Sequence, residues 1–111
     1  MDKNDLLLIE LERYLKSKYT NVERETFYFN IMPTKRRYQI DYFMSNEKII
    51  LEVNGGQWTK GRHTRAGKVK GKVYTQYEND LTKINLAQYH GFKYYQFTYE
   101  MLMRQEYKLY L

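Results

Sequence analysis

The sequence predicts an α/β (α+β) fold in which helices flank one mixed central sheet, in the order α-β-β-β-α-β-α. Three observations lead to this prediction. Two long segments, one near the start and one at 74–90, carry apolar residues at the spacing of three and four that is typical of helices. Three β-rich runs lie between these segments, and a fourth follows the second. The 111 residues fit one domain, 1–111, around a single hydrophobic core.

The first half of the chain predicts one helix and two strands. The helix runs from Asp5 to Lys18, and its apolar face is formed by Leu7, Leu8, Leu11, Tyr14 and Leu15. The aromatic run "ETFYFNI" predicts a strand that ends at the turn signal Pro33. The run "RRYQIDYF" alternates and predicts another strand. Its two faces are expected to carry Tyr38, Ile40 and Tyr42 on one side and Gln39, Asp41 and Phe43 on the other.

A hairpin is predicted next, because "SNEK" has turn composition and connects to the run "KIILEV". This second arm is apolar on both faces, which indicates a central strand covered by helices on both sides. Gly55 and Gly56 end the strand. The segment from Gln57 to about Tyr74 is rich in glycine and lysine, so we expect it to be mostly irregular.

The last third of the chain predicts a helix, a strand and a final helix. Apolar residues recur at helical spacing up to His90, and Gly91 stands where a helix C-cap glycine belongs. The run "FKYYQFT" predicts the fourth strand. Thr98 is a good N-cap for a helix formed by "YEMLMRQEYKLY".

Composition excludes several classes of protein and favours an anionic partner. The chain has no cysteine, so disulfides and thiolate metal sites are impossible. It has no run of eighteen apolar residues, so we expect a soluble, unexported protein with no membrane partner. The net charge of +6 and the pI near 9.4 favour nucleic acid as the partner. The basic residues concentrate in an acid-free stretch that contains Lys60, Arg62, Arg65, Lys68, Lys70 and Lys72, although a solvated loop has the same pattern.

One acidic residue, Glu52, interrupts the apolar strand. A buried carboxylate costs several kcal/mol unless a partner neutralises it. If the hairpin forms, Asp41 lies close to Glu52, and a divalent cation between them would relieve their repulsion. Mg²⁺ is favoured, because it binds oxygen ligands and keeps waters. The alternative is that a lysine or arginine, such as Arg36 or Arg37, neutralises Glu52 while Asp41 faces solvent.

These residues also resemble a known family. The pattern "D-x(10)-E-V-N-G-G-Q-W-x-x-G-R-H-T-R", the helix motif "ND-x-x-K-x-N-x-A" and the strand "GFKYYQFT" are similar to the PD-(D/E)XK nuclease superfamily. Within it, the small phage and bacterial endonuclease-like domains, of the VRR-NUC or very-short-patch-repair type, look most similar. The resemblance spans about residues 10–103. It implies a restriction-endonuclease-like αβββαβ core and a DNA endonuclease that depends on Mg²⁺ or Mn²⁺.

The resemblance also implies roles for individual residues. Asp41 and Glu52 match the two metal-binding acids, and the Val53 carbonyl would be a further ligand. An acid of the first helix, Glu10 or Glu12, would lie near the metal. Asn54 stands where the superfamily often has a lysine and the most similar domains an acid, which weakens metal binding and activity. The attacking water would then be positioned by Asn54, Gln57 or Lys83, the last from the following helix.

The remaining candidates are expected to contact DNA. His63, inside "GRHTR", would be a proton shuttle or a phosphate contact, although a lone histidine in a loop is commonly a surface residue. The predicted DNA-binding set is Arg36, Arg37, Lys60, Arg62, His63, Arg65, Lys68, Lys70 and Lys72. A Holliday-junction-resolvase-like cut of branched DNA is one form of this activity, and it would require a homodimer, for which the segment 99–111 offers apolar residues.

Two other hypotheses stay open. The first is a DNA-binding protein on the same fold that has lost cleavage through Asn54. The second is a protein-interaction module without DNA affinity, which the acid-free basic stretch argues against. The resemblance implies a cytoplasmic location in a bacterial cell, with a phage or mobile element as the source of the chain.

Overall fold

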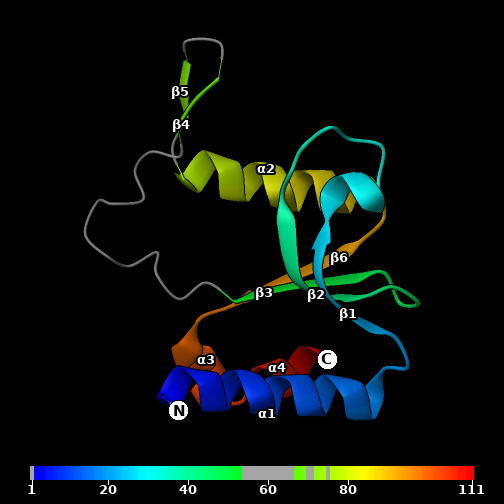
Figure 1. Ribbon diagram of the computed structural model, residues 1–111, viewed down its shortest axis with the longest axis vertical. Helices are drawn as coiled ribbons and strands as arrows, with labels where there is room; N and C mark the ends of the chain where they lie inside the picture. The colour runs from blue at the N-terminus through cyan, green and yellow to red at the C-terminus, as the bar shows by residue number, and fades with distance from the viewer. Residues whose placement is uncertain (1, 54–66, 70–71, 75) are drawn as a thin grey trace.

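The computed structural model describes residues 2–53, 67–69, 72–74 and 76–111, and the side chains of 2–53 and 78–111. Helices lie on both faces of a central mixed sheet (Figure 1). Helix α2 (Gln76–Tyr89) covers one face, and helix α1 (Lys3–Lys18) lies with the C-terminal helices on the other. The predicted α/β class is therefore confirmed.

The sheet has four strands in the order β1-β2-β3-β6. Strands β1 (Val22–Phe27), β2 (Gln39–Met44) and β3 (Ile49–Val53) pair antiparallel, and β6 (Lys93–Phe97) pairs parallel with β3. Strand β3 lies inside the sheet, and its first four residues are buried. The prediction of a central strand is therefore confirmed. Its residues are apolar on both faces because helices cover the sheet on both sides.

Local signals at the helix ends agree with the structure. Asp2 caps α1, because its carboxylate accepts a hydrogen bond from the Asp5 backbone N–H at 2.9 Å. Gly91 follows α2 with a φ of +86°, a left-handed conformation that glycine adopts without strain. Within the described part of the chain, no helix is long and apolar enough to cross a membrane.

Two predicted elements differ from the structure. Part of the segment expected to be irregular forms a hairpin of β4 (Gly67–Val69) and β5 (Lys72–Tyr74), in which each strand contains a β-branched valine that favours extended backbone. The single C-terminal helix that we expected is two short helices, α3 (Tyr99–Met103) and α4 (Tyr107–Tyr110). Gln105 lies between them with a φ of 55°, which a continuous right-handed helix cannot contain.

The strand predicted over 25–31 is also shorter on its C-terminal side. It ends at Phe27 and continues as a 3₁₀ turn, η1 (Tyr28–Asn30). The buried Tyr28 backbone N–H donates to the Tyr38 carbonyl at 2.9 Å, so the turn remains attached to the segment before β2.

The predicted alternation of β2 breaks at Asp41. Ile40 packs in the core cluster under α2, whereas Tyr42 packs in the cluster under α1. Residues two apart in a regular strand share a face, so the strand twists between them. The opposite residue on β1, Glu25, has a φ of 56°, and the strand pairs on either side of it are Arg24 with Tyr42 and Thr26 with Ile40. The distortion lies where the candidate site begins.

Candidate active site

Glu52 is the buried charged residue around which the candidate site is built. It is 4% exposed, near the end of β3, and no other charged side chain is buried among the described residues. Its neighbour Ile50, two residues earlier, packs in the cluster under α2, so Glu52 faces α2 as well. A carboxylate in this position must be compensated, because its desolvation costs several kcal/mol.

Lys83 of α2 supplies the compensating charge. Its ammonium Nζ lies 3.3 Å from Glu52 Oε2, and the Lys83 side chain is only 17% exposed. The alternative that a lysine or arginine neutralises Glu52 is therefore confirmed, but the two suggested residues are wrong: the Arg36 guanidinium lies over the Tyr38 ring and that of Arg37 over the Phe29 ring. Lys83 reaches the acid from α2, the helix from which the family resemblance implied a role for this residue, but its pairing with Glu52 was not predicted.

Tyr28 and Tyr38 hold Lys83 in place. The Tyr28 hydroxyl donates to the Lys83 backbone carbonyl at 2.9 Å, and the Lys83 ammonium lies 5.6 Å from the centre of the Tyr38 ring. Tyr38 packs edge-on against Tyr28 and donates its own hydroxyl to the Asn79 side chain at 3.4 Å. Both the backbone and the side chain of Lys83 are therefore positioned by the segment between β1 and β2.

The second oxygen of Glu52 has no such compensation. Glu52 Oε1 is buried and has no hydrogen-bond partner among the described residues. Burial raises the pKa of Glu52, the Lys83 charge lowers it, and the nearby Asp41 carboxylate raises it again. The hydrogen bond from Lys83 lowers the same pKa, and so does the nearby Tyr94 hydroxyl, although it makes no hydrogen bond to Oε1. One side of this carboxylate is thus stabilised, and the other is desolvated and unpaired.

Asp41 approaches Glu52 from the neighbouring strand. The β2–β3 register pairs Tyr42 with Leu51, so Asp41 and Glu52 come next on the two strands. Asp41 Oδ2 accepts the Val53 backbone N–H at 2.8 Å. This bond draws the carboxylate toward the end of β3, and its charge acts on Glu52. The predicted proximity of the two acids is present, on a strand twisted in a way that was not predicted.

The acid predicted to come from the first helix lies elsewhere. Glu10 Oε1 accepts hydrogen bonds from Gln105 at 2.9 Å and Tyr107 at 3.5 Å, so Glu10 is directed to the C-terminal segment. The other candidate of that helix, Glu12, is paired with Arg24 at 3.0 Å and with Lys16 at 3.6 Å. No group of three or more His, Asp or Glu side chains with metal-ligand spacing occurs in the described ranges.

Several predicted residues lie outside the described residues, namely Asn54, Gln57, Lys60, Arg62, His63, Arg65 and Lys70. Lys68 lies on β4 and Lys72 on β5, and their side chains are also outside the described part. Of the predicted DNA contacts, Arg36 and Arg37 can be placed. Arg36 shares the Tyr38 ring with Lys83, so a cation borders the candidate site on its exposed side.

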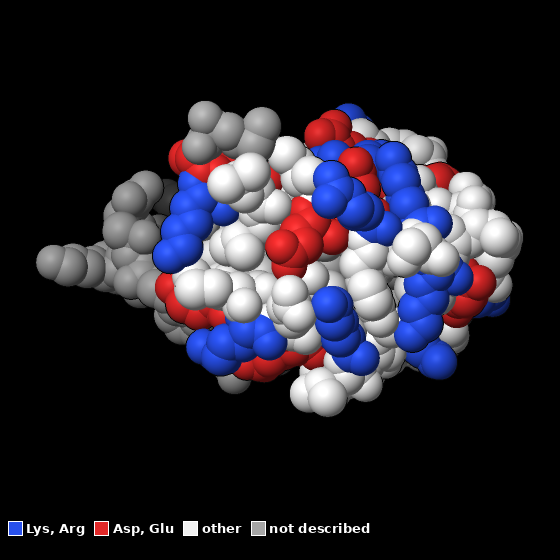
Figure 2. Space-filling model, turned by 90° about the horizontal axis from the view of Figure 1, so that it is seen from below, with Lys and Arg blue, Asp and Glu red and all other residues white. Residues whose placement is uncertain are grey.

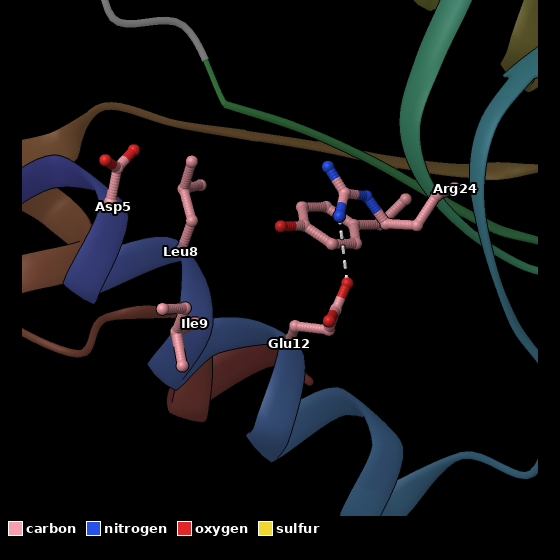
Figure 3. A pocket seen from close by; sticks show the side chains of 6 residues that line it. Asp5, Leu8, Ile9, Glu12 and Arg24 are labelled. Atoms are coloured by element: carbon pink, nitrogen blue, oxygen red, sulfur yellow. Dashed lines mark hydrogen bonds and ion pairs between the residues drawn. The ribbon is translucent and has the colours of Figure 1, made fainter. Parts of the chain in front are cut away.

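The opposite layer has a different surface. On the face formed by α1, α3 and α4, basic and acidic side chains of the described residues are interspersed and form no continuous basic region (Figure 2). A pocket of about 320 Å³ lies between α1 and the sheet, lined by Asp5, Leu8, Ile9, Glu12, Arg24 and Tyr42 (Figure 3). Its one basic group is already paired, because Arg24 Nη1 lies 3.0 Å from Glu12 Oε1. The pocket belongs to the layer of α1, whereas Glu52 and Lys83 belong to the layer of α2.

Tyr94 and Gln96 were not predicted as site residues, although both lie on β6, the strand that pairs with β3 beside Glu52. The β3–β6 register pairs Glu52 with Gln96, and Gln96 Nε2 donates to the Tyr94 hydroxyl at 2.7 Å. Residues two apart share a strand face, so their position on the Glu52 side follows once β6 is placed next to β3. The sequence alone does not show that β6 pairs with β3.

Comparisons with known proteins add no assignment to this geometry. No protein-family model matches the chain, and neither the curated proteins nor the solved structures include a significant match.

Proposed function

We propose that the protein is a DNA endonuclease that hydrolyses phosphodiester bonds with Mg²⁺ or Mn²⁺. One observation carries the proposal: Glu52 is buried beside a second carboxylate, and its Oε1 atom has no partner. A desolvated carboxylate oxygen next to Asp41 fits a hard cation, which binds oxygen ligands and would remove the repulsion between the two acids. The restriction-endonuclease-like core and the nuclease family belong to the same proposal.

Asp41 and Glu52 would hold the cation, together with the Val53 carbonyl and waters, as Mg²⁺ usually keeps several waters. When bound, the ion polarises the phosphodiester and lowers the pKa of a water molecule. Glu52 is held by β3 and Asp41 by its bond to the Val53 N–H, so both acids are fixed before substrate arrives. Such preorganisation is what electrostatic catalysis requires.

Lys83 would supply the amine that Asn54 does not. The superfamily's usual lysine is two residues after the second acid, and Asn54 in that position carries no charge. The Lys83 ammonium lies 3.3 Å from Glu52 Oε2, so it would bring a proton donor and a positive charge to a phosphate bound at Glu52. Arg36, whose guanidinium lies 5.8 Å from the Tyr38 ring, would grip a neighbouring phosphate, and a guanidinium can do so through two hydrogen bonds.

DNA is the favoured substrate class, because the chain carries a net charge of +6 and its acid-free basic stretch follows the site in sequence. The face of α1, α3 and α4 carries both signs of charge, so we place the DNA on the other side of the molecule. Branched DNA, cut by a homodimer, is the more specific form of this proposal. A DNA-binding protein without cleavage is the alternative that Asn54 supports.

The test uses supercoiled plasmid and a labelled four-way junction, incubated with the full chain and Mg²⁺ or Mn²⁺. Glu52→Gln keeps the size of the side chain and removes its charge. Asp41→Asn removes a charge but retains an amide oxygen that can still accept the Val53 N–H. Each is expected to reduce cleavage by about a hundredfold or more, as expected for the loss of metal-binding groups. Glu47→Gln, in the exposed turn before β3, is the matched control and should cleave normally.

The outcomes separate the hypotheses. Cleavage that survives both Glu52→Gln and Asp41→Asn would remove the proposed site. Salt-sensitive DNA binding without any cleavage by the unmodified protein would favour the binding protein. Absence of both binding and cleavage at moderate salt would reject a DNA function.

A further inference from the structure

The Lys83 ammonium already neutralises part of the negative charge that a metal ion would neutralise. It lies 3.3 Å from Glu52 Oε2, while Asp41 adds negative charge and Glu52 Oε1 remains without a partner. A divalent cation that binds Glu52 would therefore enter within a few ångströms of a fixed positive charge. Two cations at that separation in a buried site repel strongly, because little solvent screens them.

We propose that Lys83 and the divalent cation are alternative partners of Glu52, so that metal binding releases the Lys83 ammonium from the ion pair. This inference rests on the proposed function, because it assumes that a cation binds at Asp41 and Glu52. It adds a property that the function does not require, namely that in the metal-free protein the Lys83 ammonium occupies the position of the metal ion at Glu52.

The surroundings of Lys83 offer the released ammonium a second position. The Tyr38 ring lies 5.6 Å from Nζ, and the Arg36 guanidinium lies 5.8 Å from the same ring. The Tyr28 hydroxyl holds the Lys83 backbone carbonyl, so the side chain can turn while α2 stays in place. An ammonium that leaves Glu52 and remains over Tyr38 would lie with Arg36 as a pair of cations, which is suited to a DNA phosphate.

A coupling between metal and DNA follows. A phosphate that attracts Lys83 away from Glu52 makes the carboxylate available to the metal, and a bound metal makes Lys83 available to the phosphate. Because linkage is reciprocal, each ligand should strengthen the binding of the other by the same factor. The ion pair would thus keep the site free of metal until DNA is present.

The direct test measures Mn²⁺ binding to the full chain without DNA, by isothermal titration calorimetry. Lys83→Met is expected to bind Mn²⁺ at least about tenfold more tightly than the unmodified protein, because the competing charge is gone. Lys108→Met is the matched control: Lys108 lies 5.7 Å from the Tyr14 ring, as Lys83 lies over Tyr38, but its hydrogen-bond partner is Gln105. Its affinity should not change. Glu52→Gln should abolish binding.

Equal or weaker binding by Lys83→Met, with binding by the unmodified protein that depends on Glu52, would overturn this inference and leave the proposed function intact. Absence of Mn²⁺ binding in every variant, including Lys83→Met, would overturn both. Binding that appears only in Lys83→Met would support the inference.

A second measurement is made on the unmodified protein. In protein labelled with ¹³C at lysine Cε, the Lys83 resonance should move when Mg²⁺ is added, while the Lys108 resonance stays in place. Lys83→Arg, which retains the charge, serves to assign the signal if Lys83→Met does not fold. A Lys83 resonance that saturating Mg²⁺ leaves unchanged would show that the ion pair persists, and the inference would be wrong.

Discussion

Removal of Lys83 in the metal-free protein should expose the full cost of burying Glu52. The two side chains are 17% and 5% exposed, so solvent screens their interaction little. Breaking a buried pair by deleting one partner costs about 3–5 kcal/mol, because the other charge remains buried. We expect Lys83→Met to lose about this much free energy of unfolding at pH 8 in EDTA, which is a large part of the total stability of a small domain.

The loss should depend on pH with a defined sign. Burial already raises the pKa of Glu52, and deleting Lys83 removes the largest influence that lowers it. Between the pKa of the unfolded chain and this higher folded pKa, the native state holds a proton that the unfolded state releases. Stability from this group is therefore complete below the unfolded pKa and is lost as pH rises through the folded one. The defect of Lys83→Met should shrink on acidification by up to about 1.4 kcal/mol per pH unit.

Urea unfolding followed by circular dichroism, between pH 5 and pH 8 in EDTA, measures this effect. The double variant Glu52→Gln, Lys83→Met leaves a neutral amide in place of the charge and should recover most of the stability without the pH dependence. Lys108→Met should resemble the unmodified protein at every pH. A loss below about 1 kcal/mol at pH 8, or a loss that is constant across this range, would refute the buried-pair argument.

Two further predictions concern the neighbours of the site. Tyr94→Phe removes a hydroxyl that Gln96 orients near Glu52, so it should weaken Mn²⁺ binding about tenfold. The control is Tyr95→Phe, which should leave binding unchanged, because Tyr95 packs against Tyr110. Equal effects of the two variants in calorimetry would contradict a positioning role for Tyr94. Glu10→Gln should leave Mn²⁺ binding unchanged, because the Glu10 carboxylate is bonded to Gln105 and Tyr107; a clear loss of affinity would mean that Glu10 acts on the site after all.

Most of the architecture could be predicted from local patterns. Helical spacing located α1 and α2, and the doubly apolar run located β3 inside the sheet. These signals are local because a helix or a strand repeats its buried positions within a few residues. The hairpin of β4 and β5 and the break at Gln105 were not predicted, since short strands and a left-handed residue leave little periodic trace.

The sequence by itself determined that an acid lies in the central strand and that a second acid precedes it by one hairpin. It also supplied Lys83 on the next helix, at a distance in sequence that did not reveal the contact. Only the tertiary structure decided that Lys83, not Arg36, neutralises Glu52, that Glu10 is directed to Gln105, and that Asp41 lies at a twist opposite Glu25. These outcomes depend on which elements pack together, because a buried charge is compensated by whatever cation the fold brings within reach, and chain order does not encode that distance.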